Sequence, residues 1–229
     1  IEFNGRTLYR IEAINDFNGV KAGDIGGYIE KEENLSDNAW VSGYAKVFDN
    51  AKVSGYALIS GTAKVFDNVQ VSGNADVSGN ALISGNAWII GNAEVSGNAQ
   101  VSGNAQVSGN AQVYGNAKVS DYAKVSGNAW IIGNAVVSGN AKVSGNMKLS
   151  GNMRVNEKNG VVHISGLRFP ATIALTGINV GCKHYVDLAD FEKKYKQDGK
   201  NNEYTELELD YLHISIKNAL KLIKATKAK

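Results

Sequence analysis

Ala99-Gln100-Val101-Ser102-Gly103-Asn104 is followed without a break by Ala105-Gln106-Val107-Ser108-Gly109-Asn110, and the same six-residue phrase recurs from Ala39 to Asn152. Carried outward in this register, the phrase divides residues 27–158 into 22 hexads, and the third position of every hexad is Val, Ile or Leu. A short, fixed period predicts a solenoid, in which each repeat is stabilised by contacts with its neighbours.

The hexad alternates apolar and polar residues, which predicts a short extended segment with two faces. Ala99 and Val101 are expected to point inward, and Gln100 and Ser102 outward. The Gly-Asn pair is expected to turn a corner, because both residues tolerate left-handed backbone conformations. Three hexads then make one turn of a triangular coil, and asparagines stacked along its edges are expected to form hydrogen-bonded ladders.

This pattern resembles that of the hexapeptide-repeat proteins, and the resemblance implies a left-handed parallel β-helix. The predicted fold class is therefore an all-β solenoid of triangular cross-section with a cap at each end, since open strand edges need cover. We expect an N-terminal β cap over residues 1–26, with Arg6 to Ile14 as a strand. The β-helix is expected over residues 27–183, regular to 158 and irregular to 183, followed by a helical module over 184–229.

The expected module contains two helices. Asp187 is a good N-cap for a short helix that extends through Tyr195 and is ended by Gly199. Residues 203–226 are expected to form a longer helix, with acidic residues early and lysines late. Its apolar residues form a wide stripe, which predicts contacts either with the rod end and the short helix or with another subunit.

Composition excludes several classes of function. The formal net charge is +2, which gives no strong electrostatic attraction to nucleic acid or to an anionic membrane. A single cysteine excludes an intramolecular disulfide, no apolar run approaches the ~20 residues needed to cross a bilayer, and the first residues do not form a signal peptide. We therefore expect a cytoplasmic protein that binds neither membrane nor nucleic acid.

The hexapeptide-repeat resemblance also implies an enzymatic alternative, an acyl-CoA-dependent acyltransferase with a histidine base. No histidine occurs in residues 1–162, and residues 27–158 contain no loop insertion. His163 is expected to be an exposed residue at an outward position, and Cys182 a small buried thiol beside His184. One cysteine and one histidine are too few ligands for a closed zinc site. The sequence thus predicts no catalytic residue, cofactor or metal, and the acyltransferase is kept as the alternative function.

Residues 18 apart share a face of the predicted coil, so the outward second positions form three columns. None of the columns is a uniform ladder of threonines, which disfavours an ice-binding face. The lysines are spread over two columns rather than interleaved with aromatics along one track, which disfavours a nucleic-acid groove.

Large apolar residues at outward positions are the strongest functional signal, because clusters of aromatic residues mark contact surfaces. We predict that these residues, together with the stripe of the last helix, bind other copies in a dimer or trimer, or a protein partner. The candidate interface residues are Trp40, Phe48, Phe66, Trp88, Ile90, Tyr114, Trp130, Ile132, Leu212, Ile216, Leu220 and Ile223.

Two segments carry a narrower resemblance. Leu8-Tyr9-Arg10-Ile11 with the segment from Val20 to Glu30 resembles the leader of hexapeptide-repeat proteins encoded by phages and prophages, and Ile178 to Lys183 is similar to their C-terminal ending. The resemblance implies a non-enzymatic scaffold that binds a host protein, for example as an inhibitor of a defence system.

Overall fold

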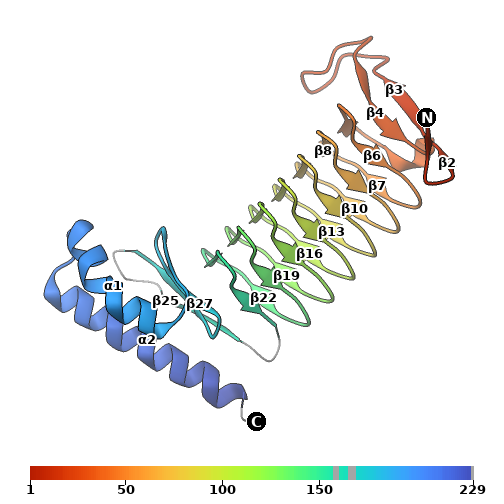
Figure 1. The fold of residues 1–229 in the computed structure, drawn as a ribbon. Coiled ribbons are helices and arrows are strands. Elements are labelled where there is room, and N and C mark those ends of the chain that lie inside the picture. Colours follow the sequence, from red (N-terminus) through yellow and green to blue (C-terminus); the bar gives the residue numbers. More distant parts are fainter. Residues whose placement is uncertain (157–159, 165–168, 228–229) are drawn as a thin grey trace.

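The computed structural model describes residues 1–156, 160–164 and 169–227. It consists of a small N-terminal β cap, a straight rod of stacked coils, and a C-terminal module of one antiparallel sheet and two helices (Figure 1). The predicted parallel β-solenoid of about seven turns is confirmed. Residues 157–159 and 165–168, which belong to the stretch where the β-helix is expected to become irregular, lie outside the described residues.

The rod has three faces, each a parallel sheet of two-residue strands that pair with strands 18 residues away. Face 1 comprises β5 (Trp40–Val41), β8 (Leu58–Ile59), β11 (Asp76–Val77), β14 (Glu94–Val95), β17 (Gln112–Val113), β20 (Trp130–Ile131) and β23 (Lys148–Leu149). Face 2 comprises β6 (Lys46–Val47), β9 (Lys64–Val65), β12 (Leu82–Ile83), β15 (Gln100–Val101), β18 (Lys118–Val119), β21 (Val136–Val137) and β24 (Arg154–Val155). Face 3 comprises β7 (Lys52–Val53), β10 (Gln70–Val71), β13 (Trp88–Ile89), β16 (Gln106–Val107), β19 (Lys124–Val125) and β22 (Lys142–Val143).

The interior of the rod is filled by the first and third hexad positions, as predicted. Ala99 and Val101 are both fully buried, whereas Gln100 is exposed. Full burial of a valine-sized or larger aliphatic side chain contributes about 1.5–3 kcal/mol before chain entropy is subtracted. Because this contribution recurs from Val41 to Val155, one hexad after another, the core is a column of small increments rather than one central cluster.

The corners differ from the prediction in one respect, since only the fifth hexad position is left-handed. Gly73 has φ +77°, and a Cβ there would lie 2.8 Å from the carbonyl oxygen of Gly91 in the next coil. Where aspartate takes this position, its carboxylate accepts from the next coil's backbone, as Asp67 does from the Gly85 N–H at 2.8 Å. The asparagines at position six instead form the expected ladders, for example Asn92 Nδ2 to Asn110 Oδ1 at 2.9 Å.

The N-terminal cap closes the first coil with backbone pairing. Its elements are β1 (Glu2–Phe3), β2 (Arg6–Thr7), β3 (Tyr9–Glu12), β4 (Ile25–Ile29) and the 3₁₀ helix η1 (Glu32–Asn34). Strand β4 pairs in parallel with β6 and antiparallel with β3, so the cap continues face 2. The single strand expected from Arg6 to Ile14 is wrong, because the chain breaks at Leu8 to bury that side chain.

The irregular continuation of the β-helix to residue 183 is also wrong. The chain forms a four-stranded antiparallel sheet from β25 (Val161–Ile164), β26 (Ala171–Ala174), β27 (Gly177–Val180) and β28 (Lys183–Tyr185). Strands β26 and β27 are joined by the two residues Leu175 and Thr176. A two-residue loop makes a hairpin, whereas paired residues of successive coils are 18 positions apart in the sequence. The C-terminal module therefore begins before residue 184.

Two helices cover one side of this sheet. Helix α1 (Leu188–Asn201) begins as predicted after Asp187, whose carboxylate accepts from the Asp190 N–H at 2.8 Å. The helix continues to Asn201, so the end expected at Gly199 is wrong. Gly199 lies inside the helix and is buried against Leu209, whose side chain leaves no room for a Cβ. Helix α2 (Glu206–Lys227) begins at a capping box of Thr205 and Glu208 rather than at residue 203.

Candidate binding surfaces

Face 1 carries an exposed aromatic cluster near the C-terminal end of the rod. Trp130 is 40% exposed, and its ring lies edge-on to that of Tyr114 with centroids 6.5 Å apart. Ile132 follows directly after strand β20 and is half-buried. The Lys148 ammonium lies 5.4 Å from the Trp130 ring centroid, in cation–π geometry. These four residues are called the Trp130 cluster.

A groove of about 370 Å³ runs beside the Trp130 cluster, where the rod meets the antiparallel sheet. Trp130 and Lys148 form its rod side, and Pro170, Thr172 and Cys182 lie on the side of the sheet. Cys182 is exposed, so the expectation of a buried thiol is wrong. The groove combines an aromatic wall, an ammonium and a thiol, and its volume falls within the usual range for ligand pockets of about 300–1,000 Å³.

A second exposed site lies on face 3. Trp88 is 42% exposed and is flanked by the half-buried Ile90 on the same hexad. Its neighbours along the face are Gln70 and Gln106. Trp88 therefore has an apolar neighbour only within its own hexad and polar neighbours in the adjacent coils, unlike Trp130.

Three other candidate interface residues, Phe48, Phe66 and Trp40, pack against other residues of the same chain. Phe48 is 6% exposed and stacks on Phe66 with ring centroids 5.0 Å apart, and Phe3 of the cap packs edge-on against Phe48. Trp40 is half-buried under Phe17 of the cap, with centroids 5.7 Å apart. The prediction of an exposed contact surface is therefore wrong for Phe48, and Phe66 and Trp40 are half-buried. These three side chains hold the N-terminal cap on the rod.

The predicted stripe of the last helix is likewise internal. Leu212, Ile216, Leu220 and Ile223 are at most 9% exposed and belong to the core of the C-terminal module. They pack with Phe191 of α1 and with residues of the sheet. The sequence left open whether this stripe contacts the chain itself or another subunit. In the structure it packs within the chain.

His163 and His184, the histidines considered for the enzymatic alternative, lie in one row across the antiparallel sheet. Register pairs place His163 beside Thr172, Thr172 beside Asn179, and Asn179 beside His184. His163 Nδ1 lies 3.3 Å from Thr172 Oγ1, and His184 Nδ1 lies 2.8 Å from Asn179 Oδ1. Burial lowers the pKa of both imidazoles. His163 is thus half-buried in this row rather than exposed on a coil.

The same row caps the rod. The Lys148 N–H donates to Thr172 Oγ1 at 3.2 Å, and Asn179 Nδ2 donates to the Lys148 carbonyl oxygen. Ser150 Oγ donates to Asn179 Oδ1 at 2.8 Å. Thr172 and Asn179 are each 2% exposed, so these polar atoms are paired and buried as stable interiors require. The row therefore has an evident structural role at the end of the rod.

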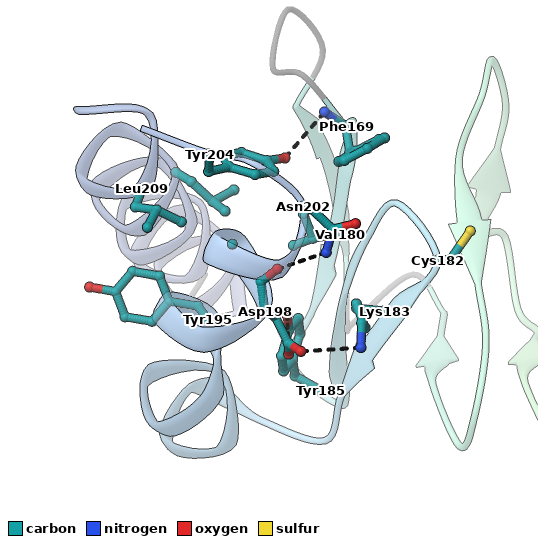
Figure 2. Close-up of a pocket in the computed structure, with 12 residues that line it drawn as sticks. Phe169, Val180, Cys182, Lys183, Tyr185, Tyr195, Asp198, Asn202, Tyr204 and Leu209 are labelled. Carbon is teal, nitrogen blue, oxygen red and sulfur yellow. Dashed lines mark hydrogen bonds and ion pairs between the residues drawn. The ribbon is translucent and has the colours of Figure 1, made fainter. Parts of the chain in front are cut away.

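A smaller cavity of about 110 Å³ lies between the sheet and the helices (Figure 2). Asp198 is its polar centre: the Lys183 ammonium lies 3.1 Å away and the Tyr185 hydroxyl donates to it at 3.0 Å. Burial, with the Asp198 carboxylate, raises the pKa of Tyr185. Apolar walls come mainly from Phe169, Tyr204 and Leu209. Nothing in the hexad pattern signals this cavity, since it forms between elements outside the repeat.

The lysines of face 2 do not form a free basic track near the N-terminus. The ammonium groups of Lys46 and Lys64 each lie 5.3 Å from the Phe3 ring centroid, so both contact the first strand of the cap. Burial, with the nearby Lys64 charge, lowers the pKa of Lys46. Within the described ranges, no group of three or more His, Cys, Asp or Glu residues could hold a metal, and neither helix combines the length and apolar character of a membrane span.

Comparison with known proteins adds no family to this description. No protein-family model matches the chain, and no curated protein matches it significantly. The parallel solenoid with an 18-residue coil is consistent with a hexapeptide-repeat β-helix.

Proposed function

We propose that this chain is a non-enzymatic β-helical binding protein that self-associates and contacts a protein partner in the cytoplasm. The observation that carries the proposal is the Trp130 cluster, where Trp130 is 40% exposed beside Tyr114 and a groove. Tryptophan and tyrosine are enriched at the centres of protein interfaces, where they contribute most of the binding energy. The other aromatic groups predicted at the N-terminal end are already used by the cap.

The nature of the partner rests on the resemblance of residues 8–11 and 20–30 to leaders of phage-encoded hexapeptide-repeat proteins. On this basis, we propose that the partner is a host protein, such as a component of a defence system. The enzymatic alternative gains no specific observation, because the hydrogen bonds of His163 and His184 belong to the capping row.

The test is affinity capture from a bacterial lysate, with bound proteins identified by mass spectrometry. Wild-type protein is expected to recover one abundant partner. Trp130→Ser is expected to recover at least ten times less of that partner. Gln112→Ser, one coil earlier on face 1, is the matched control and is expected to behave as wild type. Equal recovery by wild type and Trp130→Ser would contradict the assignment of the Trp130 cluster as the binding surface. Recovery of the chain alone would contradict the proposal of a protein partner.

A further inference from the structure

Helix α2 carries a second apolar stripe besides the one in the module core. Leu207, Tyr211, Ile214 and Leu222 are 80%, 60%, 58% and 58% exposed. At 100° per residue they lie on one side of the helix, with Asn218 among them. Figure 1 shows α2 along the outer edge of the module, with α1 and the sheet on one side of it. The exposed stripe therefore faces away from the chain's own core.

Charges border this stripe in an ordered way. Along one edge, the first half of the helix presents Glu206 and Asp210, and the second half presents Lys221 and Lys224, all of them exposed. Lys217 lies on the same edge, but its ammonium is engaged by Glu192 of α1 at 2.9 Å. The edge is thus acidic at one end and basic at the other.

We propose that two copies of the chain associate through the exposed stripes of their α2 helices, packed antiparallel about a two-fold axis near Ile214. This inference rests on the self-association in the proposed function and specifies its surface. In an antiparallel pair, the same edge of each helix lies on the same side of the seam, and the two edges run in opposite directions. Asp210 of one copy then lies near Lys221 of the other, and Glu206 near Lys224, so acidic and basic halves are complementary.

The apolar residues match in the same alignment. Leu207 of one copy lies opposite Leu222 of the other, Tyr211 opposite Asn218, and the two Ile214 side chains meet at the axis. A parallel two-fold pair would instead place this charged edge against the opposite edge of the partner helix, which carries Glu208, Ser215 and Thr226, so Lys221 and Lys224 would face no acidic residue there. A seam of 22 residues is about 33 Å long, and one helix pair of this size is smaller than a standard interface, so a reversible dimer is expected.

Disulfide trapping tests the geometry. In a Cys182→Ser background, which removes the only native thiol, Ile214→Cys is expected to form a covalent dimer under mild oxidation. Leu207→Cys alone is the matched control and is expected to remain monomeric, whereas a mixture of Leu207→Cys and Leu222→Cys proteins is expected to cross-link. Cross-linking of Leu207→Cys with itself would indicate a parallel pair, and the absence of any cross-link would overturn the proposal.

Charge exchange tests the seam without cysteines. By analytical ultracentrifugation, Lys221→Glu is expected to weaken dimerisation about tenfold or more, and the Asp210→Lys/Lys221→Glu double variant to restore it. Failure of the double variant to recover would contradict the pairing. Trp130→Ser is expected to leave the dimer intact, so loss of the lysate partner with retention of the dimer separates the two proposals. A dimer that Trp130→Ser dissociates and Lys221→Glu does not would overturn the helix seam.

Discussion

The middle of the rod and its C-terminal end satisfy their backbone hydrogen bonds in different ways. Between coils, backbone pairs with backbone: the Gln100 N–H donates to the Ala117 carbonyl at 2.9 Å. At the last coil, side chains take over: the Arg154 N–H donates to Thr176 Oγ1 at 2.6 Å, and Lys148 is paired by Thr172 and Asn179. The rod repeats one solution many times, whereas its end depends on a few individual residues.

The largest effect is expected from placing a charge inside the rod. Val101 is fully buried among aliphatic side chains, so Val101→Asp is expected to lower the free energy of unfolding by about 3–5 kcal/mol. Chemical denaturation followed by circular dichroism measures this loss. The matched control is Gln100→Asp on the outer face, with an expected change within about 0.5 kcal/mol. Similar losses in the two variants would contradict the assignment of inward and outward positions.

A smaller effect is expected at the cap. Asn179 bonds the Lys148 carbonyl, Ser150 and His184 from a buried position, so Asn179→Ala is expected to cost about 1–3 kcal/mol. Amide hydrogen exchange is expected to rise at Lys148 and its neighbours while the middle of the rod stays protected. Asn92→Ala is the matched control, because this exposed ladder asparagine is expected to cost only about 0.5–1 kcal/mol. Unchanged protection at Lys148 in Asn179→Ala would show that Asn179 does not close this end of the rod.

The same difference explains what the sequence predicts and what it leaves open. In the rod, one rule applies in every hexad, so burial at Val101, exposure at Gln100 and the faces of Trp88 and Trp130 follow from position in the period. The end has no such rule. The hexad pattern also fits Ile178-Asn179-Val180-Gly181, but the two-residue loop before this segment closes a hairpin. Asn179 would point outward in a coil, whereas in the structure its side chain is 2% exposed.

The candidate surfaces divide in the same manner. Trp130 and Trp88 are exposed because each lies at the second hexad position on a face that nothing in the described chain covers. Phe48 and Phe66 also occupy outward positions, but residues far away in sequence fold back over them. Periodicity gives the direction of a side chain and contains no information about what the cap covers. The capping box at Thr205 was available in the sequence as a local signal and marks the start of α2 more accurately than the charge pattern.

The smallest predicted effect is a dependence of the cap on pH. His163 and His184 have pKa values below the ordinary value of about 6.5 because burial disfavours the charged imidazole, and the Asp190 carboxylate only partly opposes this at His184. The unfolded chain therefore binds more protons between the folded and unfolded pKa values. Stability is complete above about pH 6.5 and decreases as the pH falls through the folded pKa values.

Hydrogen bonding gives this loss a location. Thr172 Oγ1 accepts the Lys148 N–H, which leaves its own hydroxyl hydrogen to donate to a neutral His163 Nδ1. A proton on that nitrogen removes this donation, so faster amide exchange at Lys148 is expected at pH 5 than at pH 7, after correction for intrinsic rates. The His163→Gln/His184→Gln variant is expected to lose the pH dependence while the middle of the rod stays unaffected in both proteins. If the variant keeps the full dependence, other groups are responsible, and the two histidines only fill space between the sheet and the last coil.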